Sequence, residues 1–193
     1  MKIDPHLTPK HSTWLVILLL ASIFAGGCGA EEKAAARKAT DAEIMKASQA
    51  LAPIKAQLKQ ALVSSMQEHG PVKAIDACRL EAPEIIQAAA ANGFEVGRTS
   101  TKLRNADNAA EGSLATWLEF HQSTPNSDVK HAEILPDGKV LYAEPMFVAP
   151  VCLSCHGENI PTEVKSELDR LYPNDQAIGF KENDFRGLIW IKL

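Results

Sequence analysis

Residues 134–142, Ile-Leu-Pro-Asp-Gly-Lys-Val-Leu-Tyr, decide the fold of the second half of this chain. The triplet Pro136-Asp137-Gly138 predicts a tight turn, because these three residue types suit turn positions. Apolar residues lie on both sides of it in short segments, which is typical of a β-hairpin. Phe94, Val96, Phe147 and the continuous apolar run of residues 187–191 predict further strands. We therefore expect a mostly antiparallel sheet.

The residues before this region predict helices. Thr40 and Glu43 fit a capping box, and apolar residues then recur at helical spacing: Ile44, Leu51, Ile54, Leu58 and Leu62. A long amphipathic helix is expected here, with a bend at Pro53 and an end at His69-Gly70-Pro71. A second helix would contain Ile75 and Cys78, and a third would run from Pro83 to Asn92-Gly93.

Two shorter helices are expected later, around residues 114–120 and 164–171. Helices followed by a mostly antiparallel sheet define an α+β fold. The 193 residues are enough for one domain.

The composition excludes one class of partner. The formal net charge is −4, with 46% hydrophobic and 23% charged residues. This is ordinary globular composition without the basic excess of nucleic-acid binders. No nucleic acid is expected as a partner.

Residues 1–27 have the pattern of a signal peptide. Lys2 and Lys10 precede an apolar run, residues 14–24, that is short for a membrane span but suits a signal sequence. The following Ala25-Gly26-Gly27-Cys28 resembles a bacterial lipobox, so Cys28 is expected to become the lipid-bearing N-terminus. Soluble export and an uncleaved anchor are the alternatives.

All three versions place the folded part outside the cytoplasm. The lipoprotein version places it on the periplasmic side of the cell envelope, anchored to a membrane. Residues 28–39 are polar and alanine-rich and are expected to form a tether, followed by the domain at residues 40–193.

Cys152-Leu153-Ser154-Cys155-His156 is a CxxCH motif. In this motif two thiols can bond to the haem vinyl groups and the histidine can bind iron. It predicts one covalently attached haem c with His156 as an axial ligand. The alternatives are a redox pair, half of a zinc site, and a disulfide between Cys152 and Cys155. Haem is favoured, because the sequence has no second CxxC, no paired histidines and no βαβ pattern.

Cys78 is the cysteine that remains once Cys28 is assigned to lipid and Cys152 and Cys155 to haem. A thiolate near ferric iron is favoured by the charge of the metal. Cys78 is therefore the first candidate for the distal ligand, and the alternative is a buried, inert cysteine. No methionine follows His156, which excludes the arrangement of class I cytochromes c. The other candidate ligands are interpreted as a core residue, Met146, and surface residues, His69, His121 and His131.

Four separated segments resemble the PAS-like single-haem c-type domain family, first catalogued as a domain of unknown function. They are the CxxCH motif, residues 74–78, residues 96–105, and the ending from Tyr172-Pro173 through residues 184–187. The resemblance covers about residues 41–193. It implies a PAS-like antiparallel sheet with flanking helices, and His156 and Cys78 as the two axial ligands.

Arg98, Lys102 and Arg104 lie in one of the shared segments. Such residues could hold the haem propionates, since arginine binds carboxylates with two hydrogen bonds. A solvated positive face or structural ion pairs are the alternatives. Trp117 and Phe147 are candidates for pocket walls or core, and residues 184–187 are interpreted as a turn that enters the last strand.

Histidine and thiolate ligands predict six-coordinate, low-spin iron with a low reduction potential. The leading hypothesis is an exported monohaem cytochrome for electron transfer or redox sensing, without enzymatic activity and with an unidentified redox or signalling partner. The second is a gas or ligand sensor in which the ligand displaces Cys78. The third is a peroxidase-type enzyme, for which the sequence assigns no distal acid or base.

Overall fold

The expected hairpin joins β3 (His131–Ile134) to β4 (Val140–Phe147) in the computed structural model, which describes residues 35–193. Gly138 in its turn has a φ of 82°, and its N–H donates to the carbonyl of Leu135 at 2.8 Å. Glycine suits this left-handed position because it has no Cβ. The predicted signal peptide and Cys28 lie outside the described residues.

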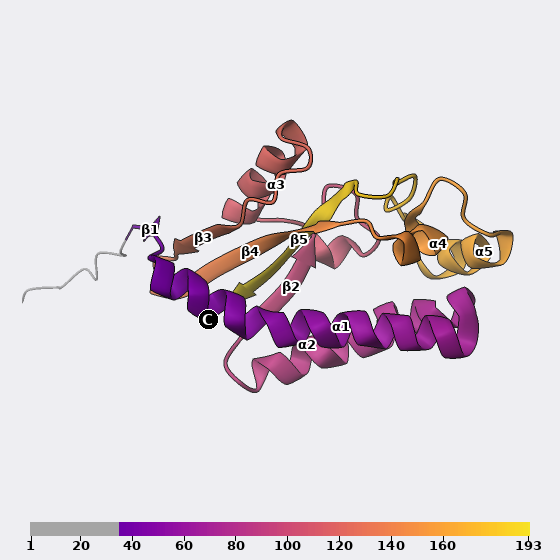
Figure 1. Ribbon diagram of the computed structural model, residues 1–193, viewed down its shortest axis with the longest axis horizontal. Coiled ribbons are helices and arrows are strands. Elements are labelled where there is room, and N and C mark those ends of the chain that lie inside the picture. The colour runs from indigo at the N-terminus through magenta and orange to yellow at the C-terminus, as the bar shows by residue number, and fades with distance from the viewer. Residues whose placement is uncertain (1–34) are drawn as a thin grey trace, which may run out of the picture. The chain divides into compact units, whose positions relative to one another are not determined.

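Five strands form one antiparallel sheet in the order β1-β3-β4-β5-β2 (Figure 1). The remaining strands are β1 (Arg37–Lys38), β2 (Glu95–Thr99) and β5 (Phe185–Lys192). Strand β5 lies between β4 and β2 and pairs with both. This confirms the expected α+β class with an antiparallel sheet.

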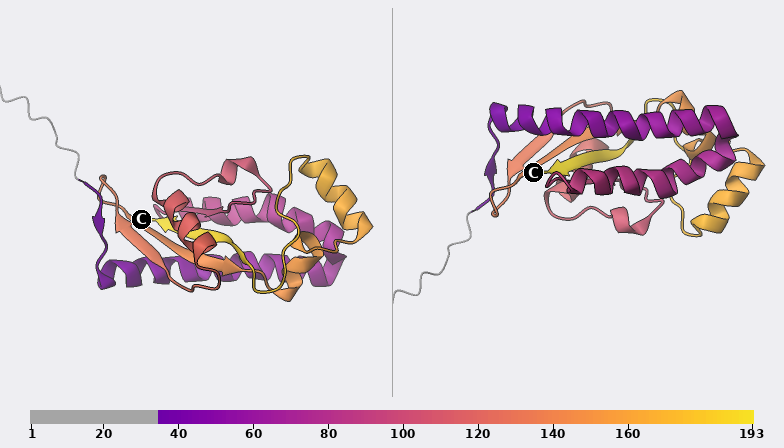
Figure 2. Two further views of the ribbon diagram at one scale, coloured as in Figure 1. Left: turned by 90° about the horizontal axis from the view of Figure 1, so that it is seen from above. Right: turned by 90° about the horizontal axis from the view of Figure 1, so that it is seen from below.

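Helices cover both faces of the sheet (Figures 1 and 2). One face packs against α1 (Asp41–Asp76) and α2 (Ala82–Ala90), and the other against α3 (Ser113–Ser123). Ile189 and Ile191 of β5 belong to the core under α1, whereas Leu188 belongs to the core under α3. Alternate side chains of β5 are thus buried on opposite faces, which explains its continuous apolar run.

The long first helix begins where the capping box predicts. The Glu43 N–H donates to Thr40 Oγ1 at 3.4 Å, and the Thr40 N–H donates to Glu43 Oε2 at 2.8 Å. Pro53 lies inside α1 with helical backbone angles, whereas Gly70 has non-helical angles, at φ 75° and ψ 176°. The predicted break is therefore at Gly70, and Pro71 opens the next turn.

The second and third predicted helices are continuous with each other. A π-helix, Ala77–Glu81, joins the end of α1 to α2, and the Ala82 N–H donates to the Ala77 carbonyl. Pro83 lies in the first turn of α2, and Gly93, with a φ of 79°, follows its end as expected.

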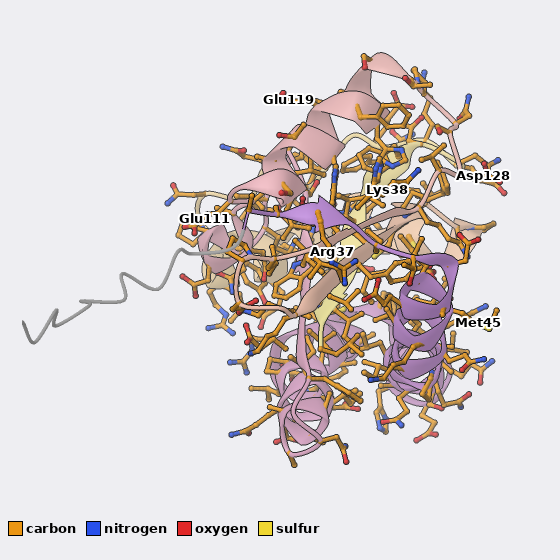
Figure 3. The ribbon with its side chains drawn as sticks, turned by 90° about the vertical axis from the view of Figure 1, so that its left-hand side faces the viewer. Arg37, Lys38, Met45, Glu111, Glu119 and Asp128 are labelled. Atoms are coloured by element: carbon orange, nitrogen blue, oxygen red, sulfur yellow. The ribbon has the colours of Figure 1, made fainter. Side chains whose placement is uncertain are left out.

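The packed part of the chain begins earlier than expected. Arg37 and Lys38, which were predicted to lie in the tether, pair with β3, and Ala39 is only 6% exposed. Figure 3 shows Arg37 and Lys38 on β1 at this end of the sheet. Arg37 also forms a 2.8 Å ion pair with Glu43. A short edge strand and one small apolar side chain suffice to bring these residues into the fold.

The CxxCH segment lies at the opposite end of the sheet from β1 (Figure 1). It comprises a 3-10 turn, Pro150–Cys152, and one helical turn, α4 (Leu153–His156), and α5 (Thr162–Leu171) follows. Another 3-10 turn, Ala106–Asn108, follows β2. Among residues 35–193, none of the helices is both long enough and apolar enough to cross a membrane.

Candidate functional site

A cavity of about 1170 Å³ lies between the α1 and α2 layer and the sheet. Its volume exceeds the roughly 300–1,000 Å³ of typical small-molecule sites. The walls come from α1, the π-helix, α2, β2, the ends of β4 and β5, and the CxxCH segment. Its apolar lining includes Leu58, Leu62, Met66, Ile86, Phe94 and Ile189. The cavity is thus wide enough and apolar enough for a large planar cofactor.

The predicted haem residues Cys152, Cys155, His156 and Cys78 all line this cavity. Burial raises the pKa of the Cys155 thiol; Arg104 opposes this shift, and the nearby thiols of Cys78 and Cys152 add to it. The three cysteines of residues 35–193 are unpaired, so the structure contains no disulfide between Cys152 and Cys155. These residues have no cluster of three or more metal-binding side chains of the kind a zinc site would need.

The π-helix brings Cys78 to the cavity from the helical layer. A π-turn contains one residue more than an α-helical turn, and such turns occur often at functional sites. Gly70, with its non-helical angles, lies about two turns before it inside α1. Cys78 and the CxxCH segment therefore reach one cavity from elements that are far apart in the sequence.

His156 is held in a defined tautomer. Its Nδ1 lies 2.6 Å from the carbonyl oxygen of Ala177, which can only accept a hydrogen bond. Nδ1 therefore carries the proton, and Nε2 keeps a free lone pair. Burial, together with the positive charges of Arg104 and Arg186, lowers the pKa of His156 to about 3. A neutral imidazole with a free Nε2 is what binding to iron requires.

Among the basic side chains that line the cavity, Arg98, Lys102, Arg104 and Arg186 come from β2, the segment that follows it, and β5. Arg104 forms a buried ion pair with Asp175 at 2.9 Å. Lys102, Arg98 and Arg186 form no ion pair within residues 35–193. Burial lowers the pKa of Arg186 to about 10, and Arg104 and Arg98 add to this shift through charge repulsion. Cations that are desolvated without a counter-charge are costly, so this wall favours an anionic group.

Arg186 is a site residue that the sequence interpretation missed. Residues 184–187 were expected to be a turn, but β5 begins at Phe185. Phe185 belongs to the core under α3, whereas Arg186 lines the cavity on the other face. The two-residue period of a strand that starts at Phe185 would have indicated this orientation.

Of the two candidate aromatic walls, Phe147 lines the cavity and Trp117 does not. Of the two alternatives for Trp117, core rather than pocket wall is the one that the structure shows. It lies on α3, and its ring stacks on His131 with a centroid distance of 5.2 Å. Met146 lines the cavity as well as packing against the core.

The histidines that were interpreted as surface residues have different environments. His69 is exposed, whereas His121 is only 1% exposed. The Nε2 atoms of His121 and His131 are 3.1 Å apart, and His121 Nδ1 has no hydrogen-bond partner. The ring of His121 also stacks on Phe185 at 4.8 Å. The buried His121 and the half-buried His131 therefore form a pair on the α3 face, in contact with Trp117, Phe120 and Phe185.

Two comparisons with known proteins bear on the family and the fold. The model of the Tll0287-like family matches residues 30–193. The crystal structure of the cyanobacterial haem protein Tll0287 shares the fold, with a TM-score of 0.59 and 23% sequence identity. That similarity covers 80% of this chain and 96% of the other. No curated protein matches the chain.

Proposed function

Since the chain belongs to the Tll0287-like family, we propose that it is a haem protein that binds one haem c through Cys152 and Cys155 and acts in electron transfer or redox sensing. His156 and Cys78 would be the axial ligands. The observation that carries the proposal is the single cavity that both cysteines, His156 and Cys78 line together.

The residues of the cavity fit such a cofactor. His156 presents a free Nε2, because its Nδ1–H is bound to the Ala177 carbonyl. Arg98 and Arg186 would supply positive charge for the propionates, and the apolar walls would exclude water from the ring. When bound, haem supplies a one-electron couple between ferric and ferrous iron.

The chain's own residues would set the properties of this couple. A thiolate at Cys78 and a basic imidazole at His156 both stabilise the ferric state, so we expect a low potential. With both axial positions taken by protein side chains, no open position is left for a substrate at the iron. This supports a role other than catalysis.

The experiment is expression in a host competent in cytochrome maturation, followed by mass and absorption measurements. We expect a mass increase of one haem, lost in Cys152→Ser combined with Cys155→Ser. Cys78→Ser should change the ferric spectrum, whereas Met146→Leu, which alters another sulfur in the same cavity, should not. A colourless wild-type protein with the mass of the bare polypeptide would overturn the proposal. A spectral change in Met146→Leu alone would move the distal ligand to methionine.

A sensor is the second candidate, because Cys78 lies in a π-turn, a helical element often found at functional sites. Carbon monoxide binding by the reduced wild-type protein would favour ligand sensing. Reversible voltammetry without ligand binding would favour electron transfer.

We also propose export with a lipid anchor at Cys28, on the periplasmic side of the envelope, as the N-terminal sequence indicates. Detergent partitioning of wild type against Cys28→Ala tests it. Equal partitioning would remove the anchor from the proposal.

A further inference from the structure

The loop of residues 175–180 forms hydrogen bonds with both the backbone and the ring of His156. The Phe180 N–H donates to the His156 carbonyl at 2.9 Å, and the Gly179 N–H donates to the Gly157 carbonyl at 3.0 Å. The ring adds the 2.6 Å hydrogen bond from Nδ1 to the Ala177 carbonyl. The position of this loop therefore decides how well Ala177 accepts from His156.

Arg104 and Asp175 fix that loop. Asp175 Oδ1 accepts from the Ala177 N–H at 2.8 Å, and its Oδ2 accepts from Arg104 Nε at 2.9 Å. Arg104 Nη2 donates to the Cys155 carbonyl at 2.6 Å. The two side chains are only 13% and 6% exposed, so water does not compete strongly for these bonds. Arg104 thus links the CxxCH segment to the peptide that holds its histidine.

We propose that Arg104 and Asp175 form a clasp that positions the Ala177 carbonyl on His156 Nδ1 and so sets the donor strength of the axial ligand. This inference rests on the proposed function. Hydrogen bonding at one ring nitrogen fixes the tautomer and raises the basicity of the other. In this role Arg104 is a positioning residue that acts through Asp175 and the loop backbone, since its own contact with the Ala177 carbonyl is long, at 3.5 Å. The propionates are left to Arg98 and Arg186.

The sign of a change in reduction potential tests the clasp. Loss of a positive charge near the iron stabilises the ferric state and lowers the potential. Loosening the hydrogen bond at Nδ1 weakens the ligand and raises the potential. We therefore expect Arg104→Gln to raise the potential of the haem-loaded protein in spite of its lost charge. Second-shell changes alter metal sites about 10–100-fold, and the lower bound corresponds to about 59 mV for one electron.

Arg98→Gln is the matched control. It removes the same charge from the same cavity, but Arg98 has no hydrogen bond to the 175–180 loop among the described residues. Its potential should fall. Arg104→Lys keeps the charge but loses the planar guanidinium that bonds Asp175 and the Cys155 carbonyl together. It should therefore raise the potential. It should also speed solvent exchange of the His156 Nδ1 proton in NMR spectra.

A lower potential in Arg104→Gln, like that of Arg98→Gln, would overturn the clasp. An unchanged potential and proton exchange rate in Arg104→Lys would overturn it too, even if Arg104→Gln failed to fold. Either result would leave the proposed haem intact, because these measurements require haem-loaded protein. Failure of the wild type to bind haem would instead refute the proposed function.

Discussion

Acidification from pH 7 to pH 5 should reduce the free energy of unfolding by about 2 kcal/mol through His131, and His131→Gln should remove most of that loss. Burial lowers the pKa of His131 from 6.5 to about 4, and the neighbouring His121 adds to the shift. As the pH falls below 6.5, the unfolded chain takes up the proton before the folded one. Stability is therefore full above pH 6.5 and is lost progressively down to about pH 4.

The magnitude follows from the linkage between pKa and stability. Each unit of pKa difference is worth about 1.36 kcal/mol, and pH 5 lies about 1.5 units below the unfolded pKa. Carboxylates in unfolded chains titrate mostly below this window, which isolates the histidine contribution.

The assay is urea unfolding of haem-loaded protein at pH 7, 6 and 5. His131→Gln is compared with wild type and with His69→Gln, which removes an exposed histidine outside the pair. Effects of the iron on the unfolded state are common to all three proteins and cancel in the differences. The reasoning is refuted if His131→Gln loses as much stability as wild type between pH 7 and pH 5.

Three further substitutions test the fold. Leu51→Ala, at a fully buried residue between α1 and the sheet, should cost about 2–5 kcal/mol in chemical unfolding. Gly187→Ala should lower the melting temperature or prevent folding, because its Cβ would lie close to the Thr99 carbonyl oxygen and its φ is 145°; a wild-type melting temperature would contradict this. Thr40→Ala should cost about 1 kcal/mol by removing the capping box, whereas the neighbouring exposed Asp41→Asn should cost less by the same assay.

The elements that the sequence predicts well are those whose signals are local. The capping box at Thr40, the break at Gly70 and the turn at Gly138 each depend on a few neighbouring residues. The strand order depends on residues that are far apart in the sequence, because β2, near the middle of the chain, pairs with β5 at its end. The π-helix was also missed, since its extra residue leaves the apolar pattern nearly unchanged.

The candidate site, too, was predictable where its signals are local and not where the contacting residues are distant in sequence. The CxxCH motif is visible in the sequence, and the structure places Cys78 in the cavity that the motif lines. Arg104 was correctly expected near the site, but its partners Asp175 and Cys155 are distant in sequence. The sequence left open whether Trp117 lies in the core or at the cavity, because an aromatic residue on a short helix carries no information on which side of a sheet the helix packs.

The π-helix that carries Cys78 makes the orientation of its sulfur depend on chain length. Successive residues of an α-helix are rotated by about 100° about the helix axis. Deletion of one residue between Ala77 and Glu81 would restore α-helical geometry, but it would also rotate one flanking segment by that angle relative to the other. A change in the length of this turn would therefore bring a different side chain to the cavity. If the proposed function holds, a single insertion or deletion here would exchange the Cys78 ligand for an open coordination position.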